Sequence, residues 1–207
     1  KHVENVIKFG SEIGWYTSVV PIHTTSFSMP RAFRTFDTTQ DFNSDEYEEI
    51  RRLICSIKKM RNAGHLLYDS DQYLDDIIRF LTKEPITWRQ KNKNICDSPN
   101  LYFAILPNGN LAPCCDFRIS REVPVQHKSF VSHFKSGALQ GQVKKITSSC
   151  DGCMYGSYPE ISISMRYLLA KIQRMQVFFA KPVNKPWPLE YDEMLSIARN
   201  IHSNKRP

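Results

Sequence analysis

The chain lacks any long apolar run, any internal repeat or low-complexity segment, and any stretch that reads as a secretory signal. No eighteen consecutive residues are apolar, so the sequence predicts no membrane span. In the absence of a secretory signal we expect reduced thiols instead of disulfides, and a cytoplasmic setting.

Positive charge exceeds negative charge only modestly. The 207 residues carry a formal charge of +7 and are 41% hydrophobic, which is enough apolar content to bury a sizeable core. The basic residues are scattered as on a solvated face, so we do not expect nucleic acid to be a partner. They include Arg51, Arg52, Lys58, Lys59 and Arg61 on the outer side of a predicted helix, and those between 181 and 206.

Four of the six cysteines have the spacing of a single metal centre. Cys150 and Cys153 form a C-x-x-C pair, whose two-residue bite lets both thiolates bind one ion or cluster. Cys96 and Cys114 are seventeen residues apart in the intervening sequence. They come close only if the chain between them turns back.

A predicted hairpin supplies that reversal. Its strands run from Leu101 to Leu106 and from Leu111 to Pro113, joined by Pro107-Asn108-Gly109-Asn110. Asn-Gly supplies the positive φ angles that a tight turn requires. The hairpin would therefore bring Cys96 back towards Cys114.

Four thiolates suit an iron–sulfur cluster or structural zinc, and spacing separates the two poorly. The competing interpretations are disulfides or inert buried thiols. Cys55 lies inside a predicted helix beside Ile54, and we expect it to be a core thiol. The spacing does not decide whether Cys114 or Cys115 is the ligand at the hairpin. Only one of them is expected to bind, because adjacent residues rarely both bind one metal.

The residues before Lys83 read as alternating helices and strands. Val3, Ile7 and Ile13 indicate the end of one helix, and the runs Trp15–Ile22 (a buried strand) and His65–Tyr68 indicate strands. Two capped helices follow the strands, one with Asn43 and Glu46 as a capping box and Gly64 at its end, the other starting at Ser70. Their apolar faces comprise Tyr47, Ile50, Ile54 and Ile57 in the first, and Tyr73, Leu74, Ile77, Ile78 and Leu81 in the second.

The cysteine pattern, C-x12-G-x4-C and then C-x2-C, resembles the auxiliary-cluster domain at the C-terminus of many radical S-adenosylmethionine enzymes. The resemblance is carried by Cys96, the runs from Leu106 to Cys114 and from Ser149 to Cys153, and the helix-like segment Ser129–Phe134 with Ile146. The full domain, called SPASM, has further cysteines after the C-x-x-C pair. None follows Cys153, so the chain is similar to the shortened twitch form with one auxiliary [4Fe–4S] cluster.

The resemblance implies a ligand set for that cluster. The implied ligands are Cys96, Cys114, Cys150 and Cys153, with Cys114 and not Cys115 at the hairpin by the family's G-x4-C rule. Zinc is the alternative metal.

One departure from the family is large. Its C-x3-C-x2-C motif, which binds the cluster that cleaves S-adenosylmethionine, does not occur in these residues. A βα unit takes about 30 residues and a barrel about 200 or more, so the part before Cys96 supplies only the last two or three units. We therefore expect the C-terminal portion of a longer enzyme, starting at Lys1 instead of a Met and inactive alone. S-adenosylmethionine and a second [4Fe–4S] cluster would belong to the N-terminal barrel half.

The expected fold class is α/β, with three parts. Residues 1–88 would be the C-terminal βα units of a partial TIM-like barrel, 89–180 the twitch domain and 181–207 a C-terminal helix and tail. After Cys153, residues 158–180 read as one long helix with a core-facing apolar stripe, and a last amphipathic piece spans Tyr191 to Ile201. The stripe comprises Ile161, Met165, Leu168, Leu169, Ile172 and Met175.

The loop from His23 to Phe42 holds the candidate substrate contacts. It follows the C-terminal end of a predicted strand, where barrel enzymes bind substrate. The candidates are His23, Ser26, Arg31 and Arg34. The alternative interpretation is that the side chains of this loop have no specific role.

The resemblance implies an auxiliary cluster that supports electron transfer during radical modification of a small-molecule or peptide substrate. An electron donor or acceptor protein would be a partner. The alternative is a non-catalytic binding module stabilised by zinc or a cluster.

Overall fold

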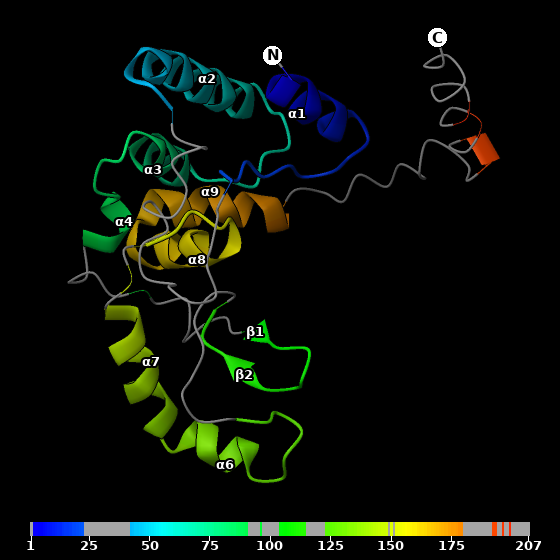
Figure 1. Cartoon of the computed structure of the whole chain (residues 1–207). Helices are drawn as coiled ribbons and strands as arrows, with labels where there is room; N and C mark the ends of the chain where they lie inside the picture. The colour runs from blue at the N-terminus through cyan, green and yellow to red at the C-terminus, as the bar shows by residue number, and fades with distance from the viewer. Residues whose placement is uncertain are drawn as a thin grey trace.

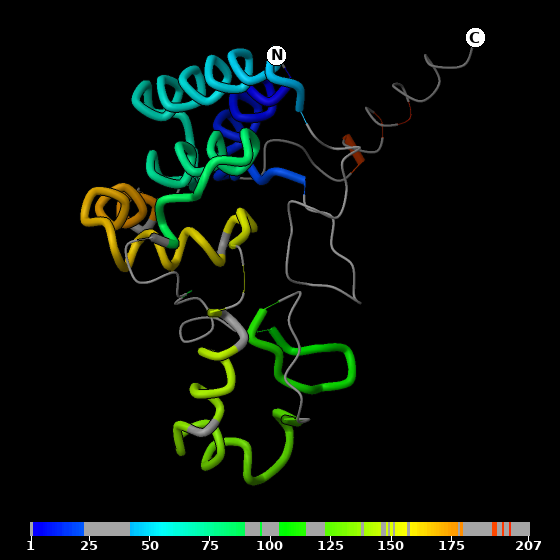
Figure 2. Tube along the Cα trace, turned by 60° about the vertical axis from the view of Figure 1, so that its left-hand side comes forward, coloured from blue at the N-terminus to red at the C-terminus, as the bar shows by residue number. Residues whose placement is uncertain are grey.

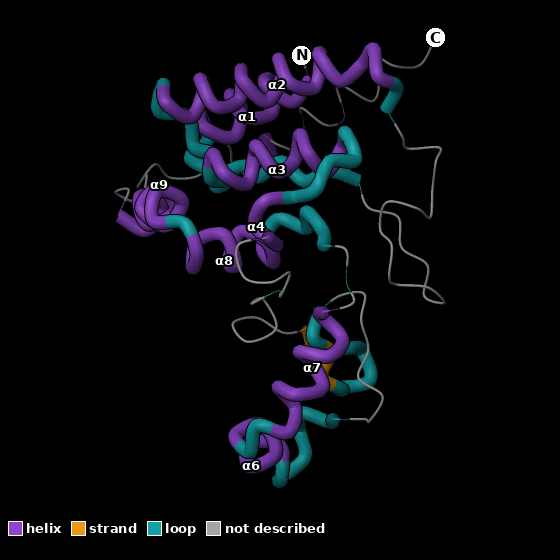
Figure 3. The backbone as a smooth tube through the Cα atoms, turned by 90° about the vertical axis from the view of Figure 1, so that its left-hand side faces the viewer, coloured by secondary structure: helices purple, strands orange, loops and turns teal. Residues whose placement is uncertain are grey.

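A computed structural model describes residues 2–22, 42–90, 96, 104–114, 123–148, 150 and 152–179, and the single positions 192, 193, 196 and 199. This part of the chain is mostly helical with one two-stranded antiparallel sheet, so the α/β class is confirmed in that broad sense (Figures 1 and 3). No helix within it is long and apolar enough to cross a membrane. The elements are α1 (His2–Glu12), α2 (Ser44–Asn62), α3 (Asp71–Leu81), α4 (Thr87–Gln90), β1 (Ala104–Ile105), β2 (Leu111–Ala112), α6 (Phe130–Lys135), α7 (Ala138–Ser148), α8 (Ser157–Arg166) and α9 (Leu168–Phe179).

These elements form two bodies that do not follow chain order (Figure 2). The helical body consists of α1 to α4 together with α8 and α9, and the hairpin lobe consists of β1, β2, α6 and α7. The chain therefore leaves the helical body after α4 and returns to it at α8.

Caps define the helices that the sequence predicted. The Asn43 N–H donates to Glu46 Oε2 at 2.8 Å, which confirms the capping box of α2. The Ser70 hydroxyl accepts from the Tyr73 N–H at 3.2 Å and caps α3. Gly64 follows α2 with a φ of +94°, a left-handed conformation that glycine adopts without steric cost.

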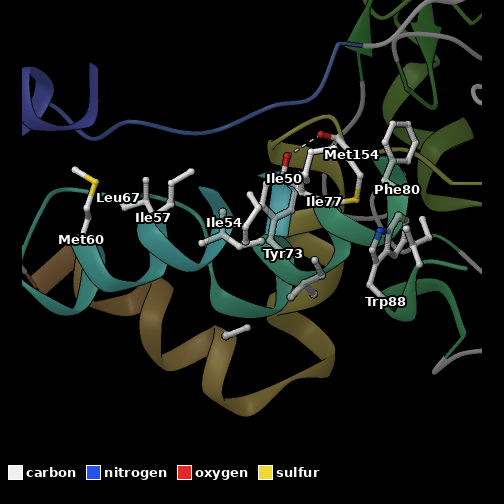
Figure 4. Close-up of a cluster of buried hydrophobic side chains, with 14 of the residues drawn as sticks. Ile50, Ile54, Ile57, Met60, Leu67, Tyr73, Ile77, Phe80, Trp88 and Met154 are labelled. Carbon is white, nitrogen blue, oxygen red and sulfur yellow. Dashed lines mark hydrogen bonds between the residues drawn. The ribbon is translucent and has the colours of Figure 1, made fainter. Parts of the chain in front are cut away.

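One apolar core joins the two ends of the helical body (Figure 4). Met154, Ile163 and Ala170 from the C-terminal side pack with residues of α2, α3 and α4, and the Tyr73 hydroxyl donates to the Met154 carbonyl at 2.7 Å. Each fully buried large aliphatic side chain contributes about 1.5–3 kcal/mol. The core residues drawn from α1 to α4 and the loops between them are Ile7, Ile50, Ile54, Ile57, Met60, Leu67, Tyr73, Leu74, Ile77, Phe80, Ile86 and Trp88.

The two predicted strands of the N-terminal part are reduced to one parallel bridge. Thr17 pairs with Leu67, and the Tyr68 N–H donates to the Thr17 carbonyl at 2.8 Å, with α2 connecting the two segments. The order along the chain, extended segment, helix and extended segment, is that of a βα unit. Burial of the first strand was predicted wrongly, because Trp15 and Ile22 are 56% and 71% exposed and no described sheet covers them.

The predicted hairpin is present in the described residues, in a short form. Ala104 pairs with Ala112 and Ile105 with Leu111. In the turn only Gly109 has a positive φ, +78°, so Asn108 does not adopt the left-handed conformation that was expected of it. Leu111 and Val123 join α7 in a second, smaller core made of Leu111, Val123, Leu139 and Val143.

The predicted long helix is two helices, because the backbone is extended at Tyr167, with φ −120° and ψ 114°. α8 packs against α3, α4 and α9. The apolar stripe of residues 161–175 was predicted to face the core, and this prediction was wrong. α8 and α9 bury Tyr158, Ile163 and Ala170 instead. The exposed members are Met165, Leu168, Leu169, Ile172 and Met175.

Two buried carboxyl groups connect segments that are far apart in the sequence. Glu160 accepts from the backbone N–H of Ser70 and, at 2.8 Å, from its hydroxyl. Asp69 accepts from the Ser18 hydroxyl and the Val19 N–H, both at 2.6 Å. Burial raises the pKa of Glu160 to about 7 and the pKa of Asp69 to about 6, although the hydrogen bonds oppose the shift in each case.

The Glu160 shift predicts how stability depends on pH. A carboxyl group whose folded pKa lies above its ordinary value contributes stability at low pH, and loses that contribution as pH rises through the folded value. Between roughly pH 5 and pH 8 the wild-type chain should lose about 2–3 kcal/mol of unfolding free energy relative to Glu160→Gln. Urea unfolding at several pH values measures this difference.

Glu48→Gln is the matched control, because the Glu48 side chain is 64% exposed on α2. Its stability should follow the wild-type pH dependence. Parallel curves for wild type and Glu160→Gln would contradict the raised pKa.

Candidate metal centre

The four predicted cysteine ligands lie at the junction of the two bodies along the chain. Cys96 lies between α4 and β1, and Cys114 lies two residues after the end of β2. Cys150 follows α7, and Cys153 precedes α8. All four are half-buried, and none of the described cysteines forms a disulfide.

The pKa of Cys153 depends on the other three cysteines. Burial raises the pKa of the Cys153 thiol well above its usual range, and the neighbouring Cys150, Cys96 and Cys114 raise that pKa further. The backbone N–H of Tyr155 acts in the opposite direction, since a hydrogen bond stabilises the thiolate. A cation bound by these sulfurs would favour their thiolate forms.

The four sulfurs do not form a coordination shell in the structure. Within the part of the chain that the structure describes, no three His, Cys, Asp or Glu side chains are gathered closely enough to hold a metal ion. The donor set nevertheless fits the chemistry, because thiolates bind both zinc and iron–sulfur clusters. The ligand set therefore stays a prediction.

A glycine shapes the C-x-x-C turn. Gly152 has a φ of +95°, and its N–H donates to the Cys150 sulfur at 3.3 Å. A Cβ at this position would lie 2.5 Å from Ile86 Cδ1 and 3.1 Å from Arg89 Cγ. Backbone conformation and packing therefore both require glycine between the two cysteines.

The same turn is attached to the helical body. Arg89 of α4 donates to the Cys150 carbonyl, and Cys96 Sγ lies 4.0 Å from the hydroxyl of the buried Ser162 in α8. Asp76 in turn holds α4, because it accepts from the Thr87 and Trp88 backbone N–H groups at 2.7 and 2.9 Å. Burial raises the pKa of Asp76.

Several predicted residues are not placed among these groups. Cys55 is exposed on α2, so its assignment as a core thiol was wrong. Ile54 and Ile57 face the core on either side of it, because helical geometry turns position 55 outward. Cys115 and the substrate candidates His23, Ser26, Arg31 and Arg34 lie outside the described residues.

Sequence reasoning did not find the groups that support the cysteine pair. Arg89 and Ser162 carry no motif, and Gly152 was visible only as the inner residue of C-x-x-C. A glycine directly before the second cysteine, in a turn too short for regular structure, was the one available signal.

Comparisons with protein-family models, with curated proteins and with solved structures found no match for this chain.

Removing a centre cysteine should remove bound metal, while removing Cys55 should not. After anaerobic reconstitution, Cys150→Ala should retain little metal, because a C-x-x-C pair with one thiolate no longer chelates. Cys55→Ala is the matched control, since that thiol is exposed on α2. Elemental analysis per chain measures the difference, and equal losses in both variants would contradict the ligand assignment.

Glycine at position 152 should prove indispensable. Gly152→Ala should cost about 2–4 kcal/mol of unfolding free energy, from left-handed strain and from overlap with Ile86. Gly141→Ala is the control, because open space surrounds Gly141 in α7 and alanine favours a helix by about 0.5–1 kcal/mol. Denaturant unfolding would refute the packing argument if both variants were equally stable.

Proposed function

We propose that this chain is the C-terminal portion of a radical S-adenosylmethionine enzyme, with Cys96, Cys114, Cys150 and Cys153 as ligands of one auxiliary [4Fe–4S] cluster. The observation that carries the proposal is the placement of the four cysteines: Cys96, Cys150 and Cys153 lie on the two segments that connect the helical body with the hairpin lobe, and Cys114 lies just after β2. The neighbouring Cys150, Cys96 and Cys114 also raise the pKa of Cys153. Cys96 and Cys153 are 57 residues apart in the sequence, yet both lie where the chain passes between the helical body and the hairpin lobe. This placement supports a common ligand site.

The N-terminal part supports the same proposal. The parallel bridge between Thr17 and Leu67, with α2 between its two segments, has the connectivity of a βα unit. We propose that these segments are the last units of a partial TIM-like barrel. The C-x3-C-x2-C motif and the S-adenosylmethionine site would then belong to the N-terminal barrel half.

The cysteine count favours electron transfer over substrate binding. A cluster supplies reversible one-electron chemistry when bound, at potentials of roughly −700 to +450 mV that the protein environment sets. Four thiolate ligands occupy all four irons and leave none open to a substrate. The N–H groups of Gly152 and Tyr155 that face Cys150 and Cys153 would tune the potential through their hydrogen bonds to sulfur.

The partners follow from this assignment. An electron donor or acceptor protein would exchange the electron, and a small molecule or peptide would be the substrate. A reducing, cytoplasmic setting suits thiols and a cluster of this kind.

A metal-stabilised binding module without catalysis is the second candidate. The N–H···S contact of Gly152 at 3.3 Å is compatible with it, because a thiolate turn of this kind serves zinc as well as iron. The two candidates differ in the metal that the chain binds.

Anaerobic reconstitution separates them. Incubated with ferrous iron, sulfide and, in competition, zinc, the chain should become brown and contain about four irons and about four sulfides. Visible absorption, elemental analysis and electron paramagnetic resonance after reduction measure the outcome. A colourless chain with one zinc and no sulfide would overturn the cluster and support the binding module.

A further inference from the structure

A cavity of about 530 Å³ opens on the hairpin lobe, beside α6. Ligand sites in proteins commonly have volumes of this order. In Figures 1 and 3, α6 lies at the end of the molecule opposite α1 and α2. None of the four centre cysteines lines the cavity, whose walls are Val123, Pro124, His127, Ser129, Phe130, Ser132, His133 and Ser136.

The polar walls present hydrogen-bond donors. The Ser129 backbone N–H donates to His127 Nδ1 at 3.2 Å, so Nδ1 is an acceptor and the neutral ring carries its proton on Nε2. The Ser129 hydroxyl lies 2.7 Å from the same Nδ1. His127 therefore keeps its Nε2–H for a ligand, and the half-buried His133 ring makes no hydrogen bond within the described residues.

The charged side chains of the described hairpin lobe are all basic. The described residues of the hairpin lobe, 104–114 and 123–148, include four lysines and two histidines but no Asp or Glu. Lys128 and Lys135 are exposed and directly adjoin the lining residues Ser129 and Ser136. A positive potential from these described residues attracts anionic ligands to a concave site.

We propose that this cavity binds an acidic peptide segment, with its carboxylates held by His127, His133 and the lysines at 128 and 135. The volume accommodates several peptide atoms and exceeds the need of a single small anion. Nucleic acid fits less well, because Phe130, the only Phe, Tyr or Trp among the described lining residues, packs against Phe134 with ring centroids 5.8 Å apart and is less available for base stacking. The described lobe also contains no arginine.

The site is separate from the cysteine centre. Its residues come from the segment 123–136, and α7 separates them along the chain from Cys150. Binding at the cavity should therefore be measurable whether the centre holds iron or zinc.

The test uses the complete chain and a fluorescent peptide of six glutamates, with a peptide of six glutamines as the neutral probe. Fluorescence anisotropy should show binding of the acidic peptide and none of the neutral one. The double variant Lys128→Gln with Lys135→Gln should weaken binding about tenfold, and His133→Ala should weaken it as well. Unchanged metal content and circular dichroism in these variants would show that the fold is intact.

The matched control is Lys144→Gln with Lys145→Gln, which removes the same charge from α7 outside the lining. It should change affinity less than threefold, a difference that distinguishes a site from a diffuse field. Equal weakening by both double variants would overturn the proposal, as would failure of the wild type to bind. Competition by inorganic phosphate or single-stranded RNA at lower concentration than the glutamate peptide would also overturn it.

Discussion

The structure depends on a buried carboxyl group that joins the two ends of the helical body. Glu160 of α8 accepts from the N–H and the hydroxyl of Ser70, and the same hydroxyl caps α3 by accepting from Tyr73. Both Glu160 and Ser70 are inaccessible to solvent, so removal of either partner would leave a buried polar group at a cost of about 1–3 kcal/mol. α8 must therefore lie where α3 begins. Gln173 of α9 repeats the constraint one helix later, because its side chain amide bonds both the N–H and the carboxylate of Asp71.

The attachment of α8 to the start of α3 also determines where the C-x-x-C pair lies. With α8 fixed, the segment before it packs Met154 under the Tyr73 hydroxyl and Gly152 against Ile86. Cys153 lies between these two anchored residues. Cys114 belongs to the hairpin lobe instead, so a metal bound by all four thiolates would tie the lobe to the helical body. The cavity proposed to bind an acidic peptide is lined by residues of the hairpin lobe, and none of the four centre cysteines is among them.

Sequence patterns predicted local features well and distant ones poorly. The capping box at Asn43, the cap at Ser70 and the hairpin around Gly109 are each determined within a few residues, and the structure contains them. The apolar stripe of α8 and α9 shows why the rest failed: periodicity identifies an apolar face but not what covers it. Nothing in the sequence marks the extended backbone at Tyr167, where neither proline nor glycine occurs. No sequence pattern marks Glu160 as buried, because its partner Ser70 is 90 positions away.

The order of the two bodies along the chain has a consequence for biosynthesis. A ribosome releases α1 to α4 first, yet their shared core lacks Met154, Ile163 and Ala170 until the whole hairpin lobe has been made. During that interval the faces of α3 and α4 that will receive α8 remain open, and the start of α3 lacks the carboxyl group that completes its cap. Contacts between residues so far apart form slowly, because a long loop must close first. The newly made N-terminal helices thus pass through a stage with exposed apolar surface, a situation in which nascent chains depend on chaperones.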